Sequence, residues 1–413
     1  MTRRRAWLLA IAAAVVVAAV VVPLAVVGNS PPRSRASRPL TPPMSSTTAP
    51  STTTTVRGTS TTAPSLPASW TTRTVPAGVA GPLTDVTCPT TSACYAVGGT
   101  RNDSGSASII ASADGGSTWK LAYSAPTTYL SGIACMGATR CIAVGGTSAL
   151  TERPLLLVSA DRGHQWMQKA LPAQVGDLNT VACASAATCV AAGFSAGGAS
   201  AAIGEPTLLR TTDGGTEWTP EAVPPGLTSI TTVSCRTNSL CVVGGSGPGP
   251  TASSRSVAAT STNGGRTWTA PSVVNQSAGF GDIACIDPQT CVGSLYSGAT
   301  TTAGQGRAVV TTDGGAVWSV LNTAVGGAES CSQTMCLSVG GSPHTTTRQH
   351  PVWFVMAFVT TDRGQSWAKV RVPAYQGIPY GASCDASDVC VVVGGGTDSA
   401  LGTRPAVIMT YGH

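Results

Sequence analysis

The chain has 413 residues, a formal net charge of +6 and only 10% charged residues, with 48 Gly and 28 Pro. Such a composition, rich in Val and Thr and poor in long helix formers, favours short strands joined by tight turns and predicts an all-β body. Seven arginines and no acidic residue precede Trp70, which leaves 17 basic and 18 acidic residues in the rest. A nearly neutral body lacks the basic surface that phosphate backbones require, so we expect no nucleic-acid partner.

The first 28 residues carry a basic cluster followed by an apolar run. Arg3, Arg4 and Arg5 precede a 21-residue uncharged stretch, 7–27, which is long enough to cross a hydrocarbon core of about 30 Å as a helix. Positive flanks stay cytoplasmic, so the chain after Gly28 is expected outside. A cleaved signal peptide and secretion are the alternative, but VVGNS offers no small-x-small cleavage site. We predict a signal anchor, a transmembrane helix, over 1–28.

The segment 29–69 is predicted to be a disordered linker. Within 31–69, Pro, Ser and Thr occupy 26 of 39 positions, a composition that cannot build a core and favours extended, solvated backbone. The predicted anchor and linker together make the remainder, 70–413, a membrane-tethered extracytoplasmic domain.

Six similar segments recur in that domain. They are SADGGSTW (112–119), SADRGHQW (159–166), TTDGGTEW (211–218), STNGGRTW (261–268), TTDGGAVW (311–318) and TTDRGQSW (360–367). Their tryptophans are 47 to 52 residues apart, the length of one four-stranded propeller blade. An acidic or amide side chain at the head of a tight turn accepts backbone N–H bonds, and Gly supplies positive φ.

These segments resemble the Asp-box, or BNR, repeat of sialidase-like propellers, where the motif forms the turn between the third and outermost strands of a blade. The structural Asp-box positions are Asp114, Asp161, Asp213, Asn263, Asp313 and Asp362. Arg162 and Arg363 replace the first Gly in two copies. Six spaced copies cannot share one active site, so we interpret the motif as structural rather than catalytic.

All 14 cysteines fall into seven pairs in step with this repeat. The pairs are Cys88/Cys94, Cys135/Cys141, Cys183/Cys189, Cys235/Cys241, Cys285/Cys291, Cys331/Cys336 and Cys384/Cys390. Each pair lies between two β-prone runs, which predicts a hairpin from the innermost strand to the next, bridged by a disulfide. Zinc binding is the rival interpretation, but zinc sites prefer closer spacing and a second ligand pair.

The domain has seven cysteine pairs but only six Asp-box segments, and the two ends of the domain explain the difference. The segment RPAVIMTYGH (404–413) matches a third strand and stops where the box should follow, whereas ASWTTRTVP (68–76) matches the outer strand QSWAKVRVP (365–373). We therefore predict that Trp70 and its neighbours supply the missing strand of the last blade. The result is a closed, seven-bladed β-propeller with four-stranded blades and no free sheet edge at the closure.

The resemblance carries three functional models. Sialidases have six blades, an arginine triad and a Tyr/Glu nucleophile pair; xyloglucanase-type glycosidases use two seven-bladed propellers around a cleft; photosystem II assembly factor-like proteins use a single seven-bladed ring as a binding platform. This chain is similar in organisation to the last group. The resemblance implies a binding or scaffold module for a protein or glycan at the cell envelope, without a cofactor and with a monomeric propeller. A sialidase-like glycoside hydrolase acting on surface glycans is the alternative.

An enzyme of that kind needs two carboxylates about 5 to 9.5 Å apart. Asp85, Asp282 and Glu329 lie near the starts of predicted innermost strands and could meet at the mouth of the ring. We interpret them instead as turn caps and solvated rim residues, and assign no catalytic residue. The four histidines, 164, 344, 350 and 413, are scattered, so we expect no metal site.

The connections on the face opposite the cysteine hairpins and the boxes differ most in length and composition, so we place a ligand there. Arg153, Arg255, Arg307 and Arg404 each precede the box position of their blade by six to eight residues. Arginines around that face would favour a carboxylate, a phosphate or an acidic protein surface. Ordinary rim charge is the alternative.

Overall fold

The computed structural model describes residues 69–100, 105–137, 139–147, 153–196, 204–249, 254–276, 278–297, 306–344, 352–373, 376–396 and 405–412. The predicted anchor and linker lie outside these residues. Within the described ranges, no helix is long and apolar enough to cross a membrane. All described residues belong to one compact unit, Ala63–His413.

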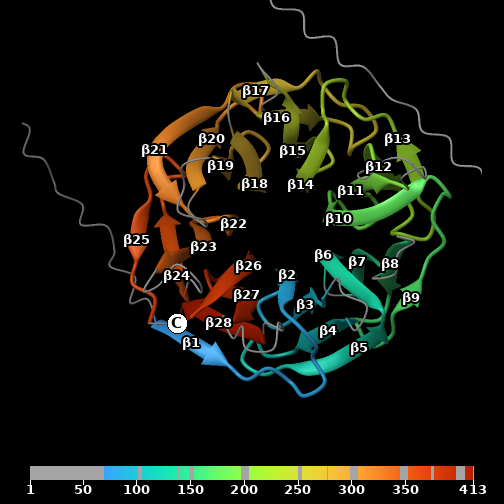
Figure 1. Cartoon of the computed structure of the whole chain (residues 1–413), viewed down its shortest axis with the longest axis vertical. Coiled ribbons are helices and arrows are strands. Elements are labelled where there is room, and N and C mark those ends of the chain that lie inside the picture. The colour runs from blue at the N-terminus through green and yellow to red at the C-terminus, as the bar shows by residue number, and fades with distance from the viewer. Residues whose placement is uncertain are drawn as a thin grey trace, which may run out of the picture. The chain divides into compact units, whose positions relative to one another are not determined.

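The described chain forms seven four-stranded antiparallel sheets arranged around a central axis (Figure 1). Blade 1 contains β2 (Leu83–Thr87), β3 (Cys94–Gly98), β4 (Ser106–Ser112) and β5 (Lys120–Pro126). Blade 2 contains β6 (Thr128–Met136), β7 (Arg140–Thr147), β8 (Pro154–Ser159) and β9 (Met167–Gln168). Blade 3 contains β10 (Val175–Cys183), β11 (Cys189–Ser195), β12 (Pro206–Thr211) and β13 (Thr219–Glu221).

The remaining blades repeat this order from the axis outward. Blade 4 contains β14 (Ser229–Thr237), β15 (Leu240–Pro248), β16 (Ser254–Ser261) and β17 (Ser272–Asn275). Blade 5 contains β18 (Ala278–Cys285), β19 (Cys291–Ser297), β20 (Gly306–Thr311) and β21 (Ser319–Val325). Blade 6 contains β22 (Ala328–Cys331), β23 (Cys336–His344), β24 (Val352–Thr360) and β25 (Ala368–Val370). Blade 7 contains β26 (Gly377–Cys384), β27 (Cys390–Gly396), β28 (Ala406–Gly412) and, as its outer strand, β1 (Ser69–Arg73).

The ring closes as the sequence predicts, because β1 pairs antiparallel with β28 from Ser69↔Gly412 to Arg73↔Ile408. In Figure 1 the two strands lie side by side although they come from opposite ends of the described chain. The rings of Trp70 and Tyr411 pack with their centroids 4.8 Å apart. This strand gives blade 7 the outer edge that its own segment lacks.

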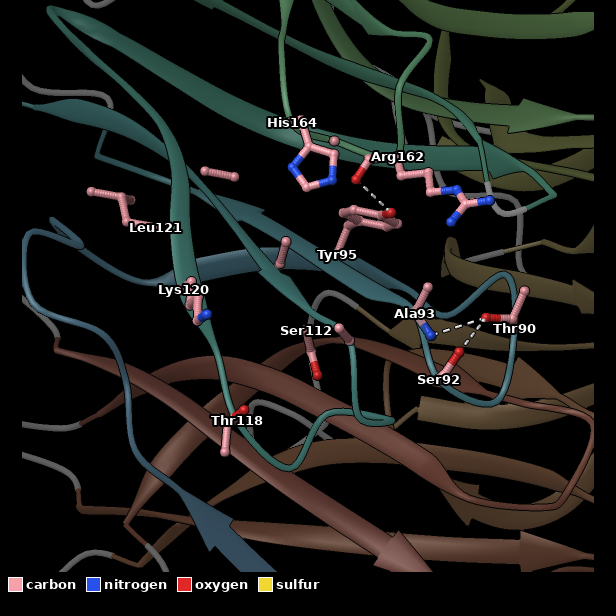
Figure 2. A pocket seen from close by; sticks show the side chains of 14 residues that line it. Thr90, Ser92, Ala93, Tyr95, Ser112, Thr118, Lys120, Leu121, Arg162 and His164 are labelled. Atoms are coloured by element: carbon pink, nitrogen blue, oxygen red, sulfur yellow. Dashed lines mark hydrogen bonds between the residues drawn. The ribbon is translucent and has the colours of Figure 1, made fainter.

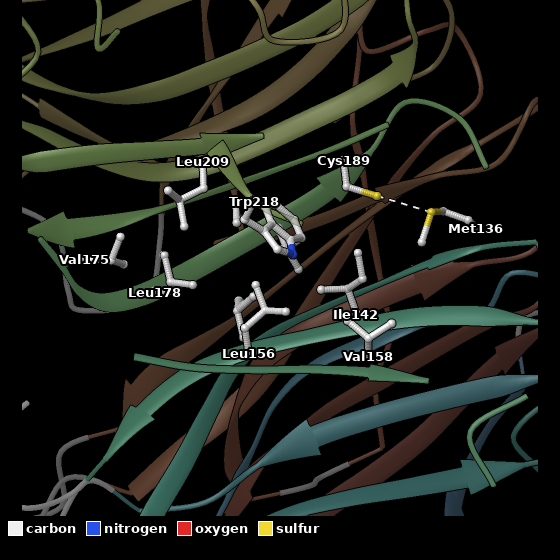
Figure 3. Close-up of a cluster of buried hydrophobic side chains, with 12 residues drawn as sticks. Met136, Ile142, Leu156, Val158, Val175, Leu178, Cys189, Leu209 and Trp218 are labelled. Carbon is white, nitrogen blue, oxygen red and sulfur yellow. Dashed lines mark hydrogen bonds between the residues drawn. The ribbon is translucent and has the colours of Figure 1, made fainter. Parts of the chain in front are cut away.

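Side chains between neighbouring blades form the core. The second strand of each blade is buried along most of its length, which explains why these strands have nearly continuous apolar sequences instead of alternating ones. Between blades 2 and 3, Trp218 is 6% exposed and packs among Ile142, Leu156 and Leu178 (Figure 3). Its indole N–H donates to the carbonyl of Gly215 at 3.3 Å, so the buried ring keeps its one polar group satisfied.

The turn between the third and fourth strands, called the box turn below, contains the repeated motif. In blade 1 the Asp114 carboxylate accepts the backbone N–H of Thr118 at 2.8 Å and the hydroxyl of Ser112 at 2.7 Å. Gly115 has a φ of 68°, and Arg162 and Arg363 hold the same left-handed conformation at 64° and 63°. Arginine therefore keeps the geometry of the turn at these two positions, at a local cost of about 1–2 kcal/mol.

The seven predicted disulfides are present, with Cα–Cα distances of 3.9 to 4.1 Å. They join Cys88 to Cys94, Cys135 to Cys141, Cys183 to Cys189, Cys235 to Cys241, Cys285 to Cys291, Cys331 to Cys336 and Cys384 to Cys390. Each bridge spans the hairpin between the innermost and second strands, called the cysteine hairpin below. Each contributes about 2 kcal/mol in the chain-entropy account.

Cys235 and Cys241 face each other across their hairpin, as predicted. Cys241 lies inside β15, after Leu240, and Cys235 lies inside β14. Strand pairing continues past the bridge to Thr237↔Leu240, with a register shift between Cys235 and Thr237. Because the two residues 238–239 are enough to close this hairpin, Cys241 is enclosed by the sheet and is 0% exposed. Its sulfur is therefore purely structural and out of reach of a ligand.

The cysteine hairpins and the box turns lie on one face of the propeller. Backbone bonds join the hairpin to the box turn of the same blade, for example Gly115 N–H to the Ser92 carbonyl at 2.8 Å. The same contact recurs in blade 3, where the Gly214 N–H donates to the Ala187 carbonyl at 2.9 Å. A side chain in a box turn is therefore held at a fixed distance from the hairpins around it.

Candidate functional site

The innermost strands bring two equivalent aspartates to the contacts between blades. Asp85 and Asp282 each stand three residues before the first cysteine of their hairpin, where a register shift interrupts the pairing of the strand. Asp85 accepts the N–H of Val86 and the N–H of Ile133 from the next blade, both at 2.8 Å. The bulge therefore turns the carboxylate away from its own sheet and toward a neighbour.

Asp282 repeats this bridge in blade 5. Its carboxylate accepts the N–H of Ile283 at 2.8 Å and the N–H of Glu329, from blade 6, at 3.0 Å. It also accepts the hydroxyl of Thr232, from blade 4, at 2.8 Å. Asp282 thus links three consecutive blades.

Glu329 is buried, at 5% exposed, whereas Asp85 and Asp282 are half-buried. One carboxylate oxygen accepts the Ser338 hydroxyl at 2.8 Å and the other accepts the Ser294 hydroxyl at 3.1 Å. Because Ser294 lies in blade 5 and Ser338 in blade 6, this side chain also joins two blades. Our interpretation of these acids as turn caps and solvated rim residues is wrong: they hydrogen-bond across the interfaces between innermost strands.

Burial controls the protonation of these groups. Desolvation raises the pKa of Asp85 to about 7 against the opposing effect of two N–H donors, and the charge of Asp282 adds to the rise. Desolvation raises the pKa of Asp282 as well, and it raises the pKa of Glu329 well above its usual range, with the Asp282 charge contributing. A glycosidase pair must face a substrate with oxygens free to donate or attack. Here the oxygens of Asp282 and Glu329 are occupied by neighbouring blades.

A pocket of about 750 Å³ lies where blade 2 meets blade 1, on the face of the hairpins and box turns (Figure 2). Blade 1 contributes its cysteine hairpin with Thr90, its box turn and the start of β5 with Lys120. Blade 2 contributes its box turn with Arg162 and His164. The floor is Tyr95, 3% exposed, whose hydroxyl donates to the Arg162 carbonyl at 2.9 Å. This bond fixes the box turn of blade 2 over the pocket.

Charge in the pocket has one sign. Lys120, Arg162 and His164 line it and are exposed, whereas none of the described lining residues is acidic. Asp161 stands close to His164, but its carboxylate is held inside the box turn by the Gln165 N–H and the Ser159 hydroxyl. The site can therefore bind an anionic group through paired hydrogen bonds from the Arg162 guanidinium and a hydrogen bond from the Lys120 ammonium. The pocket was not predicted from the sequence, although the replacement of Gly by Arg162 in a turn motif was a usable signal.

The arginines predicted to form a site lie on separate sheets. Arg153 precedes β8 in blade 2, Arg255 lies in β16 of blade 4 and Arg307 lies in β20 of blade 5, where its Nε donates to the Leu321 carbonyl at 3.3 Å. Arg404 lies outside the described residues, as do most of the loops of that face. A ligand site on that face remains a prediction.

Searches with the sequence found no matching family model and no matching curated protein. Comparison with solved structures found YCF48 bound to D1 peptide, at 15% identity and a TM-score of 0.54, covering 84% of this chain and 97% of that one. The likeness is one of fold. The GH74 enzyme of Niastella koreensis matches at 15% identity and a TM-score of 0.51, covering 81% of this chain. The WD40 repeats of RRP9 match at 10% identity and a TM-score of 0.56, covering 83% of this chain and 96% of that one.

These matches confirm the propeller resemblance inferred from the sequence. The chain spans 55% of the length of the GH74 enzyme, whereas it corresponds to nearly all of the YCF48 chain. Its organisation is therefore that of a single ring.

Proposed function

We propose that this chain is an extracytoplasmic binding module, tethered to a membrane through 7–27, whose propeller binds a cell-envelope ligand in the pocket between blades 1 and 2. One observation carries the proposal: the carboxylates of Asp85, Asp282 and Glu329 accept hydrogen bonds from neighbouring blades, while the open pocket is lined by Lys120 and Arg162 and has no acid among its described lining residues. This distribution suits recognition of a ligand, and it leaves Asp85, Asp282 and Glu329 poorly placed to act as a hydrolytic carboxylate pair.

The likeness to YCF48, whose structure contains a bound D1 peptide, supports a binding role only at the level of the scaffold. Rigid propeller strands place turn residues at fixed positions, which is where binding residues concentrate. The tether and the compartment rest on the apolar run and its arginine flank. Carbonate washing of membranes from cells that express the full chain should leave it in the pellet, and release into the wash would overturn the tether.

A binding test uses the full chain in detergent, immobilised, against envelope extract. The matched pair is wild type and a Lys120→Gln/Arg162→Gly variant, which keeps the box-turn geometry because four of the six copies carry Gly at that position. We expect a ligand captured by wild type and depleted from the variant. Equal capture by both proteins would place binding elsewhere on the ring.

Hydrolysis is tested on the same protein with chromogenic glycosides. We expect no turnover that depends on Asp282 or Glu329. Turnover by wild type that disappears in both Asp282→Asn and Glu329→Gln, with the thermal midpoint retained, would replace the binding role by the glycosidase alternative.

A further inference from the structure

Arg162 and Arg363 occupy the same position of two box turns and differ in their partners. Both replace the first Gly of the motif, and their φ angles are 64° and 63°. Each box turn meets the cysteine hairpin of the preceding blade. The pair is therefore an internal comparison in which the backbone is held constant.

Arg363 has a carboxylate partner within the fold. Its guanidinium forms an ion pair with Asp287 in the hairpin of blade 5. It also donates to the Thr290 hydroxyl at 2.8 Å. Asp287 and Thr290 lie two and five residues after Cys285, so the hairpin itself neutralises the charge of this box turn.

Arg162 faces a hairpin from which that carboxylate is missing. The residues two and five positions after Cys88 are Thr90 and Ala93, and both line the pocket beside Arg162. Among the described residues, no ion pair or side-chain hydrogen bond of the Arg162 guanidinium is found. Lys120 adds charge of the same sign. Arg162 therefore lies beside its hairpin as Arg363 does, but the hairpin beside Arg162 has no carboxylate.

The strand beside the pocket, β5, favours a peptide as the ligand that brings the anionic group. β5 is the outermost strand of blade 1, and within the described residues no strand pairs with its outer edge. It has seven residues, as β21 does, whereas β1 has five and β9, β13, β17 and β25 have two to four. Lys120, Leu121 and Ala122 at its start line the pocket. An extended peptide can bond to such an edge through its backbone while its side chains enter adjacent pockets.

We propose that this pocket binds an acidic peptide segment, with a carboxylate on the Arg162 guanidinium in the place that Asp287 takes on Arg363 and with the peptide backbone along the start of β5. The inference rests on the proposed binding function and names its ligand class. Lys120 adds a second, less directional contact to the same anion. The apolar side chain of Leu121, 39% exposed, contacts the uncharged part of the peptide.

The test measures binding of two fluorescein-labelled heptapeptides to the full chain in detergent, by anisotropy at two salt concentrations. The peptides are identical except that one carries two Asp residues and the other two Asn residues. We expect the Asp peptide to bind more tightly, and Arg162→Gly to weaken it about tenfold, as for loss of a charged hydrogen-bond pair. Arg363→Gly is the matched control and should leave binding unchanged.

A second variant tests the same contact by supplying the missing anion within the chain. Thr90→Asp introduces the carboxylate that blade 5 carries at Asp287, so Arg162 becomes paired internally and the Asp peptide should be excluded. Equal binding of both peptides, or wild-type affinity in both Arg162→Gly and Thr90→Asp, would overturn the proposal.

Two further outcomes separate this inference from the proposed function. If a galacturonic acid oligosaccharide binds in an Arg162-dependent way and the Asp peptide does not, the peptide proposal is overturned while the pocket remains a binding site. If wild type captures an envelope ligand that Arg162→Gly captures equally well, the pocket proposal is overturned and the binding module stands. Absence of any captured ligand would overturn the binding function itself.

Discussion

Two sets of carboxylates in this propeller accept similar numbers of hydrogen bonds, but their pKa values are shifted in opposite directions. In the box turn of blade 1, the hydroxyl and N–H of Thr118 lower the pKa of Asp114 to about 2. Between the innermost strands, burial raises the pKa values of Asp85, Asp282 and Glu329. The difference is access to water: donors lower the pKa of an exposed carboxylate, but the loss of hydration outweighs them when the carboxylate is enclosed.

Removing an enclosed carboxylate should have the largest effect. Glu329→Ala leaves the Ser294 and Ser338 hydroxyls without their acceptor and opens a cavity between blades 5 and 6. We expect the free energy of unfolding to fall by about 2–4 kcal/mol. Denaturant unfolding of both proteins at the same pH measures this with disulfides intact. A loss below about 0.5 kcal/mol would show that the acid does not hold the blades together.

The two sets of carboxylates should have opposite effects on how stability depends on pH. The inter-blade acids should lower stability as pH rises, and the box-turn acids should lower it as pH falls. A raised folded pKa means that the folded state binds more protons, so stability falls as pH rises from about 4 through 7, on the order of 2 kcal/mol. A lowered pKa, as at Asp114, gives stability that is present above about pH 4 and lost as pH falls toward about 2. Thermal midpoints measured from about pH 2 to about pH 9 should therefore peak near pH 4–5.

Glu329→Gln tests whether Glu329 causes the loss of stability as pH rises. Serine hydroxyls can accept as well as donate, so the amide retains both partners without a titrating group. Because burial raises the pKa of Glu329, we expect a flatter decline as pH rises and an unchanged acidic side. If the variant keeps the wild-type decline, Glu329 is not its source, and the decline comes from Asp85 and Asp282.

Within the box turns the expected effects are smaller. Asp114→Ala removes the acceptor for the Thr118 N–H and hydroxyl and should cost about 1 kcal/mol, as for loss of a helix cap with similar bonds. Asp114→Asn should cost less, because Asn263 already serves in blade 4 by accepting the Thr267 N–H at 2.9 Å. Urea unfolding at neutral pH ranks the two variants. Equal losses would indicate that the charge, not the acceptor geometry, stabilises the turn.

The smallest effect is expected for Asn263→Asp. The Asn263 amide donates to the Thr267 hydroxyl at 2.7 Å, and a carboxylate would accept from that hydroxyl, as Asp114 does from Thr118. Stability at neutral pH should change by less than about 0.5 kcal/mol, with additional loss below about pH 4. A larger change at neutral pH would contradict the equivalence of the two turns.

The fold was predictable because its determinants are local and repeated. The spacing of the tryptophans, the paired cysteines and the match of Trp70 to Trp367 each report on one blade or on the closure, and their agreement fixes the number of blades. The disulfides followed for the same reason, since both cysteines of a pair belong to one hairpin.

The contacts that define the candidate site depend on neighbouring blades and were not predictable in the same way. Whether Asp282 caps a turn or binds the N–H of Glu329 depends on a strand bulge and on a residue 47 positions away. The role of Arg162 depends on the hairpin of the preceding blade, where Thr90 stands in place of an aspartate. A single sequence shows the residues of neighbouring blades but does not show which of them are in contact.

Closure by β1 also bears on the order in which the chain folds. The Ser69–Gly412 contact joins residues 343 positions apart, while the pairs within a blade join near neighbours. Local hairpins form early, but a contact of such sequence separation must bring together the two ends of nearly the whole domain. Until β28 has been synthesised, β1 has no partner strand. Closure of the ring therefore waits for β28, and the last blade is completed by the first strand that the structure describes.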